Sequence, residues 1–192
     1  SIEVEQFLQL IDTEEGAEVA AYLFAQSGAK QKKQILQQLK PKFQEVMEDG
    51  CAGRFLAAAA PFVDDTKTVN ELVLEPAKKL IRAGALSAPK SVARTHLELL
   101  FAACTSQLVP LASGEKVQGL SAADALLLQH CQLVSQCKKP ADKRQAELRA
   151  YTAKVLVEGL DTVEKVARFL CTRGAAGLIV QAVLGELDQA LL

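Results

Sequence analysis

Apolar side chains in the stretch from residue 30 to 63 recur at helical spacing, but in three short runs instead of one long one. In the first run, KQKKQILQQL, the side chains of Ile35, Leu36 and Leu39 share one face. The pattern leaves Lys32, Lys33 and Gln37 on the opposite face. It predicts a short amphipathic helix over residues 30–39.

Two residues interrupt the pattern after this helix. Pro41 disfavours helical geometry at the residue before it, so we expect a second helix, PKFQEVMEDG, to begin at Pro41. Gly50 is expected to end that helix in the left-handed conformation. A third helix, AGRFLAAAAPFV, then follows, in which residues 57–60 present only methyl groups and let neighbouring helices approach closely.

The same order of three helices recurs near the end of the chain. A helix is expected to start at Pro140, a second is expected to be capped by Asp161, and residues 175–192 give a third. Small or branched residues align the third helices at positions 16, 52, 92 and 176, which are 36, 40 and 84 residues apart. A period of this length predicts an α-solenoid, in which each unit buries its apolar face on its neighbours. A helical bundle with chance spacing is the alternative.

The middle of the chain fits this period least well. A loop is marked by Pro110, Ser113, Gly114 and Gly119, and Ser121 with Asp124 predicts a helix start for residues 122–137. We expect one continuous solenoid with repeats over 1–100, an irregular repeat with a loop insertion over 101–139, and a C-terminal repeat over 140–192.

Composition favours an all-α protein and restricts the kinds of partner. Ala and Leu supply much of the 49% hydrophobic content, and Trp is absent. No stretch offers the roughly 20 apolar residues of a membrane span, so we expect no membrane partner. The net charge of −1 gives no overall cationic field, and nucleic-acid binding would have to be local.

The sequence shows no pattern of catalysis or metal binding. Five cysteines, without a Cys-x-x-Cys pair, are expected to be reduced thiols in helical surroundings. His96 is expected to be a hydrogen-bonded packing residue. His130 and Cys131 are neighbours that point about 100° apart on a helix, so they cannot act as a nucleophile and its base. We expect no enzyme activity, no cofactor and no small-molecule substrate. The acidic first residues argue against a signal peptide, and the absent initiator Met suggests a fragment.

One segment resembles a known family. The segment DTEEGAEVAAYLFAQSGAKQKKQILQQLKPKFQEVMEDGCAGRFLAAAAPFVDDTK is similar to repeats of the Puf-A/Penguin family, divergent Pumilio-like proteins of the nucleolus. The resemblance is good over residues 10–100, loose over 140–192 and poor between. Its matching features are Glu-Gly followed by Val at 15–19, Gly-Ala-Lys-x-x-Lys at 28–33, Leu-Lys-Pro at 39–41 and Val-Asp-Asp-Thr-Lys at 63–67.

The resemblance implies a curved array of Pumilio-like, armadillo-like three-helix repeats that binds RNA largely without sequence preference. It also implies a role in assembly of the large ribosomal subunit in the nucleolus or nucleus. The partners would be ribosomal or pre-ribosomal RNA and ribosome-assembly proteins. The chain would then be the C-terminal region of a longer protein, with its CPL domain.

Candidate RNA contacts follow from the repeat register and from clusters of basic residues. The positions at which third helices would read bases are mostly Ala, Gly and Leu, and Arg54 and Arg94 are the exceptions. Each arginine could instead pair with a local carboxylate, and the lysines could simply be solvated helix faces. The basic clusters are Lys30, Lys32, Lys33, Lys40 and Lys42, and Lys138, Lys139, Lys143, Arg144 and Arg149.

A second hypothesis is a protein-binding adaptor of the armadillo or HEAT type that makes no direct RNA contact. The near-neutral charge favours the adaptor, whereas the Puf-A-like segments favour RNA binding.

Overall fold

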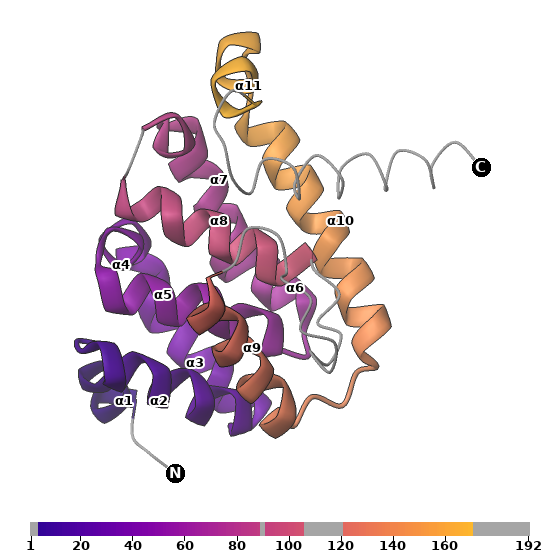
Figure 1. Ribbon diagram of the computed structural model, residues 1–192. Coiled ribbons are helices and arrows are strands. Elements are labelled where there is room, and N and C mark those ends of the chain that lie inside the picture. Colours follow the sequence, from indigo (N-terminus) through magenta and orange to yellow (C-terminus); the bar gives the residue numbers. More distant parts are fainter. Residues whose placement is uncertain (1–3, 89–90, 106–120, 171–192) are drawn as a thin grey trace.

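The structure is a computed structural model that describes residues 4–88, 91–105 and 121–170, and within these ranges the regular elements are all helical (Figure 1). The prediction of an all-α protein is therefore confirmed. The α-helices in the described ranges are α1 (Val4–Leu10), α2 (Glu14–Gln26), α3 (Ala29–Leu39), α4 (Phe43–Glu48), α5 (Gly50–Ala59), α6 (Thr66–Val69), α7 (Glu75–Arg82), α8 (Val92–Thr105), α9 (Ala122–Val134), α10 (Ala141–Gly159) and α11 (Val163–Leu170). Short 3-10 turns η1 (Lys40–Lys42), η2 (Ala60–Phe62) and η4 (Ala85–Ser87) and one π-helical segment, η3 (Asn70–Leu74), join them.

The break between the second and third helices was assigned to the wrong residue. Gly50 is the first residue of α5 and not a left-handed cap, and Gly84 is the glycine with positive φ among the described residues. Asp49 makes the turn instead, because its carboxylate accepts hydrogen bonds from the backbone N–H groups of Cys51 and Ala52 at 2.9 and 2.8 Å. Pro41 lies in η1, and α4 begins two residues later than expected.

Three helix starts near the end of the chain were predicted with mixed success. Ser121 caps α9, since its Oγ accepts from the N–H of Asp124 at 3.1 Å, although the helix ends at Val134 and not at residue 137. Pro140 immediately precedes α10, as expected. The cap of α11 is Thr162 and not Asp161, because Thr162 Oγ1 accepts from the N–H of Lys165. The predicted loop markers at 110–119 and the predicted helix at 175–192 lie outside the described residues.

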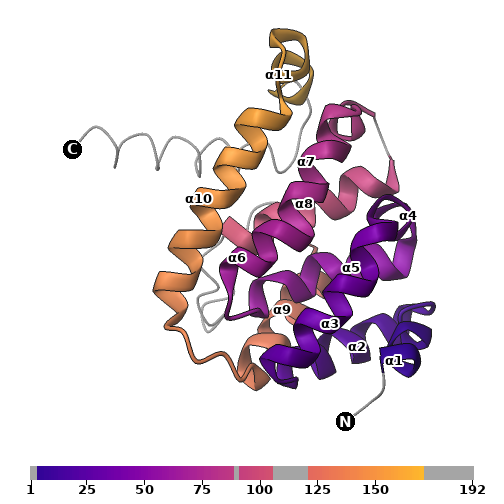
Figure 2. The same ribbon diagram turned by 180° about the vertical axis from the view of Figure 1, so that it is seen from behind.

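The segments aligned by the sequence register lie side by side. Helix α5 packs between α2 and α8, and these three helices contain the aligned positions 16, 52 and 92 (Figures 1 and 2). Helix α9 lies along α2, and α10 lies along α7 and α8. In both views α1–α3 form one end of the molecule and α11 the other.

The core is built around α5. The rings of Phe7, Phe24 and Phe55 form a cluster with centroids 5.3 to 6.4 Å apart, which joins α1, α2 and α5. Ala58 and Ala59 are completely buried, so the alanine run allows the close helix approach that the sequence predicted. Within the described ranges, no helix is long and apolar enough to cross a membrane.

Candidate nucleic-acid interface

Arg54 holds three helices together. On α5, its Nη1 lies 2.9 Å from Oε1 of Glu18 on α2, and its Nε donates to Oδ1 of Asp124 on α9 at 2.8 Å. Burial disfavours the charged guanidinium, but the hydrogen bonds to Asp124 and Glu18 outweigh that effect and raise the pKa of Arg54. RNA contact by Arg54 would require a phosphate to replace one of these carboxylates.

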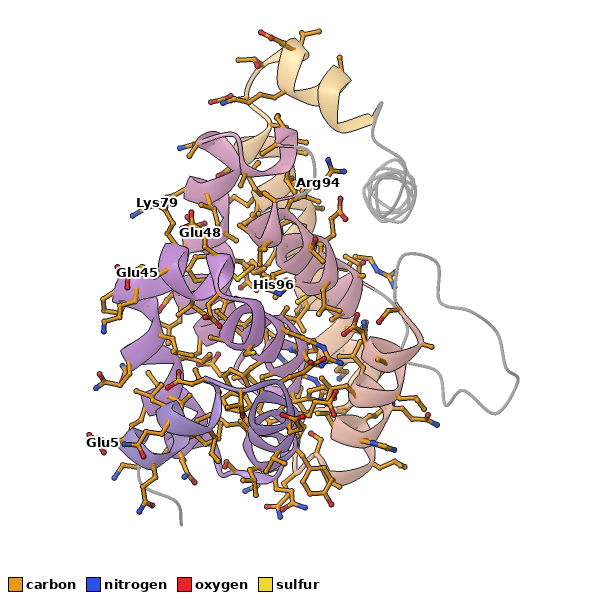
Figure 3. All side chains as sticks on the ribbon, turned by 60° about the vertical axis from the view of Figure 1, so that its left-hand side comes forward. Glu5, Glu45, Glu48, Lys79, Arg94 and His96 are labelled. Atoms are coloured by element: carbon orange, nitrogen blue, oxygen red, sulfur yellow. The ribbon has the colours of Figure 1, made fainter. Side chains whose placement is uncertain are left out.

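Arg94 lies on α8, next to the helix that carries Arg54, as the repeat register predicted. Its Nε donates to Oε1 of Glu98, one turn along the same helix, at 2.8 Å, and the residue is 9% exposed (Figure 3). The two arginines at equivalent register positions are therefore both paired with carboxylates. RNA contact through either arginine stays a prediction.

Lys32 is buried, although the sequence pattern placed it on the outer face of α3. Only 3% of the residue is exposed, and its Nζ donates to the carbonyl oxygen of Phe62 at 2.7 Å. The Nζ also lies 5.8 Å from the ring centroid of Phe24, and burial lowers the pKa of this lysine. Lys32 thus satisfies a carbonyl at the end of η2 and does not face solvent.

Arg144 has a similar structural role from the opposite side. It is 9% exposed, its Nε donates to the carbonyl oxygen of Pro61 at 3.0 Å, and its Nη1 donates to that of Lys139. The side chain of Lys139 is paired with Glu147. Of the second predicted basic cluster, Lys138 and Lys143 remain exposed.

Three other predicted lysines form a row on α3 and η1. Lys30, Lys33 and Lys40 are exposed, and their spacing of three and seven residues places them along one side of the helix. None of the three makes an ion pair with any residue that the structure describes. We call these residues the α3 lysine row, which spans about 15 Å at the rise of an α-helix.

Two further features modify the charge near this row. Lys42, also in η1, is exposed. Asp65 has a pKa below its ordinary value, chiefly because Thr68 donates a hydrogen bond to it, with a smaller effect from the nearby Lys33. One carboxylate therefore lies close enough to the row to weaken its field at Lys33.

Two clefts adjoin the two ends of the row. The first, of about 460 Å³, lies between α1, α2 and α3, next to Lys30. The second, of about 290 Å³, lies between η1, α4 and α7, and includes both Lys40 and Lys79, which is exposed. Figure 3 shows Lys79 with Glu45 and Glu48 of α4 nearby. The lining residues of the first cleft are Gln6, Phe7, Leu23, Gln26, Ser27, Gly28 and Gln31.

Sequence reasoning missed the glutamines of the first cleft and Lys79. Gln6 and Gln26 lie 20 residues apart in the sequence, and Gln31 belongs to a run that was interpreted only as an amphipathic helix. No pattern in the sequence therefore indicated that these glutamines line one cleft. The side-by-side position of Lys40 and Lys79 had no signal in the sequence, because it depends on how α7 packs against η1.

The prediction for His96 is confirmed, and the prediction of free thiols on helices is confirmed for Cys51, Cys104 and Cys131 but is wrong for Cys137, which lies beyond the end of α9. His96 is 6% exposed, and its Nδ1 lies 2.9 Å from the carbonyl oxygen of Met47, as a packing histidine requires. Cys104 and Cys131 are buried free thiols whose pKa values burial raises to about 12. Cys51 and Cys137 are half-buried and also free. In the described ranges, no three His, Cys, Asp or Glu side chains are grouped so that they could hold a metal ion.

Comparison of the chain with protein-family models, with curated proteins and with solved structures gave no match.

Proposed function

We propose that this protein is a non-catalytic scaffold that binds structured RNA through the α3 lysine row. The observation that carries the proposal is the exposure of Lys30, Lys33 and Lys40 along one face, without carboxylate partners among the described residues. Lys32, Arg54, Arg94 and Arg144 have partners inside the protein, so they contribute less to the outer field.

A row of separate ammonium groups suits phosphate contact without base reading. Each lysine offers a point charge that neutralises a phosphate and releases its counterions, which gives affinity that depends on salt and not on sequence. Lys79 extends the field beyond Lys40 through the shared cleft.

The biological setting rests on the sequence resemblance to the Puf-A/Penguin repeats. The packing of α5 between α2 and α8 is compatible with a Pumilio-like solenoid, because such an array aligns equivalent helices of successive units. On this basis we propose that the RNA is ribosomal or pre-ribosomal, and that the protein takes part in large-subunit assembly in the nucleolus with other assembly proteins.

A salt titration of RNA binding tests the lysine row. Binding of a labelled structured RNA is measured by fluorescence anisotropy for the parent and for the variant Lys30→Gln, Lys33→Gln, Lys40→Gln. We expect the triple variant to bind roughly tenfold more weakly at low salt, with a log–log salt slope smaller by about 2 to 3, since up to three phosphate contacts are lost.

A matched control separates the row from a general charge effect. The variant Lys138→Gln, Lys143→Gln, Lys154→Gln also removes three positive charges. Lys138 precedes α10, Lys143 and Lys154 lie on α10, and all three are exposed. This control variant should bind within about twofold of the parent. Equal weakening by both triple variants would show that the α3 lysine row is not the site.

A second candidate function is a protein-binding adaptor. The observation that favours it is the exposure of Leu126 and Leu133, 52% and 78%, seven residues apart on the same face of α9. Absence of RNA binding at low salt would favour this function over the first.

A further inference from the structure

The cleft between α1, α2 and α3 has the chemistry of a small polar binding site. Gln6 reaches it from α1 and Gln26 from the end of α2, while Leu23 and Phe7 supply apolar surface. Both glutamines are exposed, and neither amide is hydrogen-bonded to any residue in the described ranges. The hydroxyl of Ser27 donates to the carbonyl of Leu23 at 2.8 Å, so its oxygen is left as an acceptor towards a ligand.

Size and charge restrict what this cleft can hold. Its volume of about 460 Å³ is near the lower end of small-molecule sites, and it is open to solvent. The residues that line the cleft are all uncharged, so the cleft itself offers no cation to an anionic group. The cation nearest in the sequence stands just outside the lining residues, since Lys30 precedes the cleft residue Gln31 on α3. This arrangement suits a ligand with a neutral, flat, hydrogen-bonding part and an anionic part.

A nucleotide has both parts. A primary amide places a donor and an acceptor on adjacent atoms, which matches the edge of a nucleobase, and proteins read bases through glutamine in this way. Because the amide rotates about its last side-chain bond, it can meet the donor and acceptor pattern of more than one base. A paired base is stacked in its helix and cannot enter a cleft, so the base must be unpaired.

We infer that this cleft holds the base of one unpaired RNA nucleotide, while a phosphate that flanks it lies on Lys30. The inference rests on the proposed RNA-binding function and adds the kind of RNA that is bound. The cleft beside Lys79 does not offer the same chemistry, because the amide nitrogen of its Gln44 already donates to Glu48 at 3.0 Å.

A comparison of two RNA hairpins with the same stem tests the inference. One is fully paired up to a short closing loop, and the other carries a three-nucleotide unpaired bulge in the stem. Affinities are measured by fluorescence anisotropy at one salt concentration for the parent and for the double variant Gln6→Ala, Gln26→Ala. We expect the parent to bind the bulged hairpin about tenfold more tightly, the scale of one base contact.

The double variant should lose this preference without losing its affinity for the paired hairpin. Gln34→Ala with Gln38→Ala is the matched control, since both glutamines are exposed on α3 but do not line the cleft. This control should keep the preference of the parent. Circular dichroism confirms that each variant is folded.

The outcomes separate the cleft from the lysine row. If the parent binds both hairpins equally well, or if the Gln6 and Gln26 variant keeps the preference, the cleft is not a nucleotide site, and binding through the lysine row still stands. If the parent binds neither hairpin at low salt, both the inference and the proposed function are wrong.

Discussion

Gly53 on α5 lies against the imidazole of His96 on α8 so closely that a Cβ at position 53 would be 2.1 Å from Nδ1 of the ring. The ring cannot move away freely, because the same Nδ1 lies 2.9 Å from the carbonyl oxygen of Met47 at the end of α4. One glycine and one histidine therefore fix the packing of α4, α5 and α8. Gly53 directly follows Ala52, one of the positions by which the sequence register aligns third helices, and it marks a close approach of two of these helices.

Replacement of Gly53 by alanine should destabilise the protein. Alanine gains about 1 kcal/mol of helix propensity over glycine, but the overlap with His96 forces a shift in a packed interface, which costs roughly 1 to 3 kcal/mol. We expect a lower Tm in thermal unfolding followed by circular dichroism. Gly50→Ala is the control, since no atom lies within 4 Å of a Cβ at that position. A Tm for Gly53→Ala equal to or above that of Gly50→Ala would contradict the close approach.

Added volume in the alanine run of α5 should also be costly. Ala58 and Ala59 are 1% and 0% exposed, so Ala58→Leu and Ala59→Leu each overpack the core by about 1 to 3 kcal/mol. For a chain of this size the Tm should fall by about 2 to 4 °C per kcal/mol. Ala146→Leu on the exposed face of α10 is expected to leave the Tm unchanged. Unchanged melting of both core variants would refute the packing described for α5.

The helix ends show what sequence reasoning could reach. Ser121 and Pro140 act within a few residues of their own position, so the starts of α9 and α10 could be predicted from the sequence alone. The error at Gly50 arose because two residues could each make the turn at this boundary. The carboxylate of Asp49 caps the next helix, and the backbone of Asp49 is extended, so no left-handed residue is needed. Both the acid and the glycine are normal at a helix boundary, and only their geometry decides between them.

The lysines of α3 show where the site prediction failed. Lys32 precedes Ile35, Leu36 and Leu39 by three, four and seven residues, so helical periodicity alone would have placed it on the buried face. Lys33, one residue later, is exposed. The fate of Arg144 could not be read in the same way, because its acceptor, the carbonyl of Pro61, is 83 residues away in the chain.

Removal of the Arg54 side chain should loosen α9. In Arg54→Ala, the carboxylates of Glu18 and Asp124 lose their shared cation, and the hydrogen bond from α5 to α9 is lost. We expect faster amide hydrogen exchange across residues 122–134, with little change in helical content. RNA affinity should fall less in the Arg54→Ala, Arg94→Ala double variant than in the lysine-row variant. A loss as large as that of the lysine-row variant would instead move the RNA site to α5 and α8.

Asp64 makes stability depend on acid pH. Burial alone raises the pKa of this carboxyl, but the N–H groups of Lys138 and Lys139, which donate to it at 2.9 and 3.1 Å, outweigh burial and bring the pKa below its ordinary value. The ionised form is therefore favoured by folding. The carboxylate of Asp64 therefore contributes its full stabilisation of the folded protein above the ordinary pKa of about 4. This stabilisation is lost as the pH falls through the lower pKa that Asp64 has in the folded protein.

The variant Asp64→Asn measures this contribution. It should have a lower Tm than the parent at pH 7, and the difference should shrink as the pH falls below about 4, where the parent loses the same charge. Glu71→Gln, at an exposed position in η3, is the control for the removal of one carboxylate. A Tm difference for Asp64→Asn that does not change with pH would show that its hydrogen bonds do not favour the ionised form.

RNA affinity should depend on salt and RNA shape much more than on sequence. The positions that the sequence register makes equivalent are mostly Ala, Gly and Leu, and the two arginines among them are paired with carboxylates. In the proposed function, the exposed lysines would contact phosphates, which every sequence has, and a rotatable glutamine amide would adapt to more than one base. Competition between unrelated RNAs of matched length and secondary structure measures the preference directly. A preference for one sequence larger than about 1 to 3 kcal/mol, the scale of one specific base contact, would show that the protein reads bases through residues other than these.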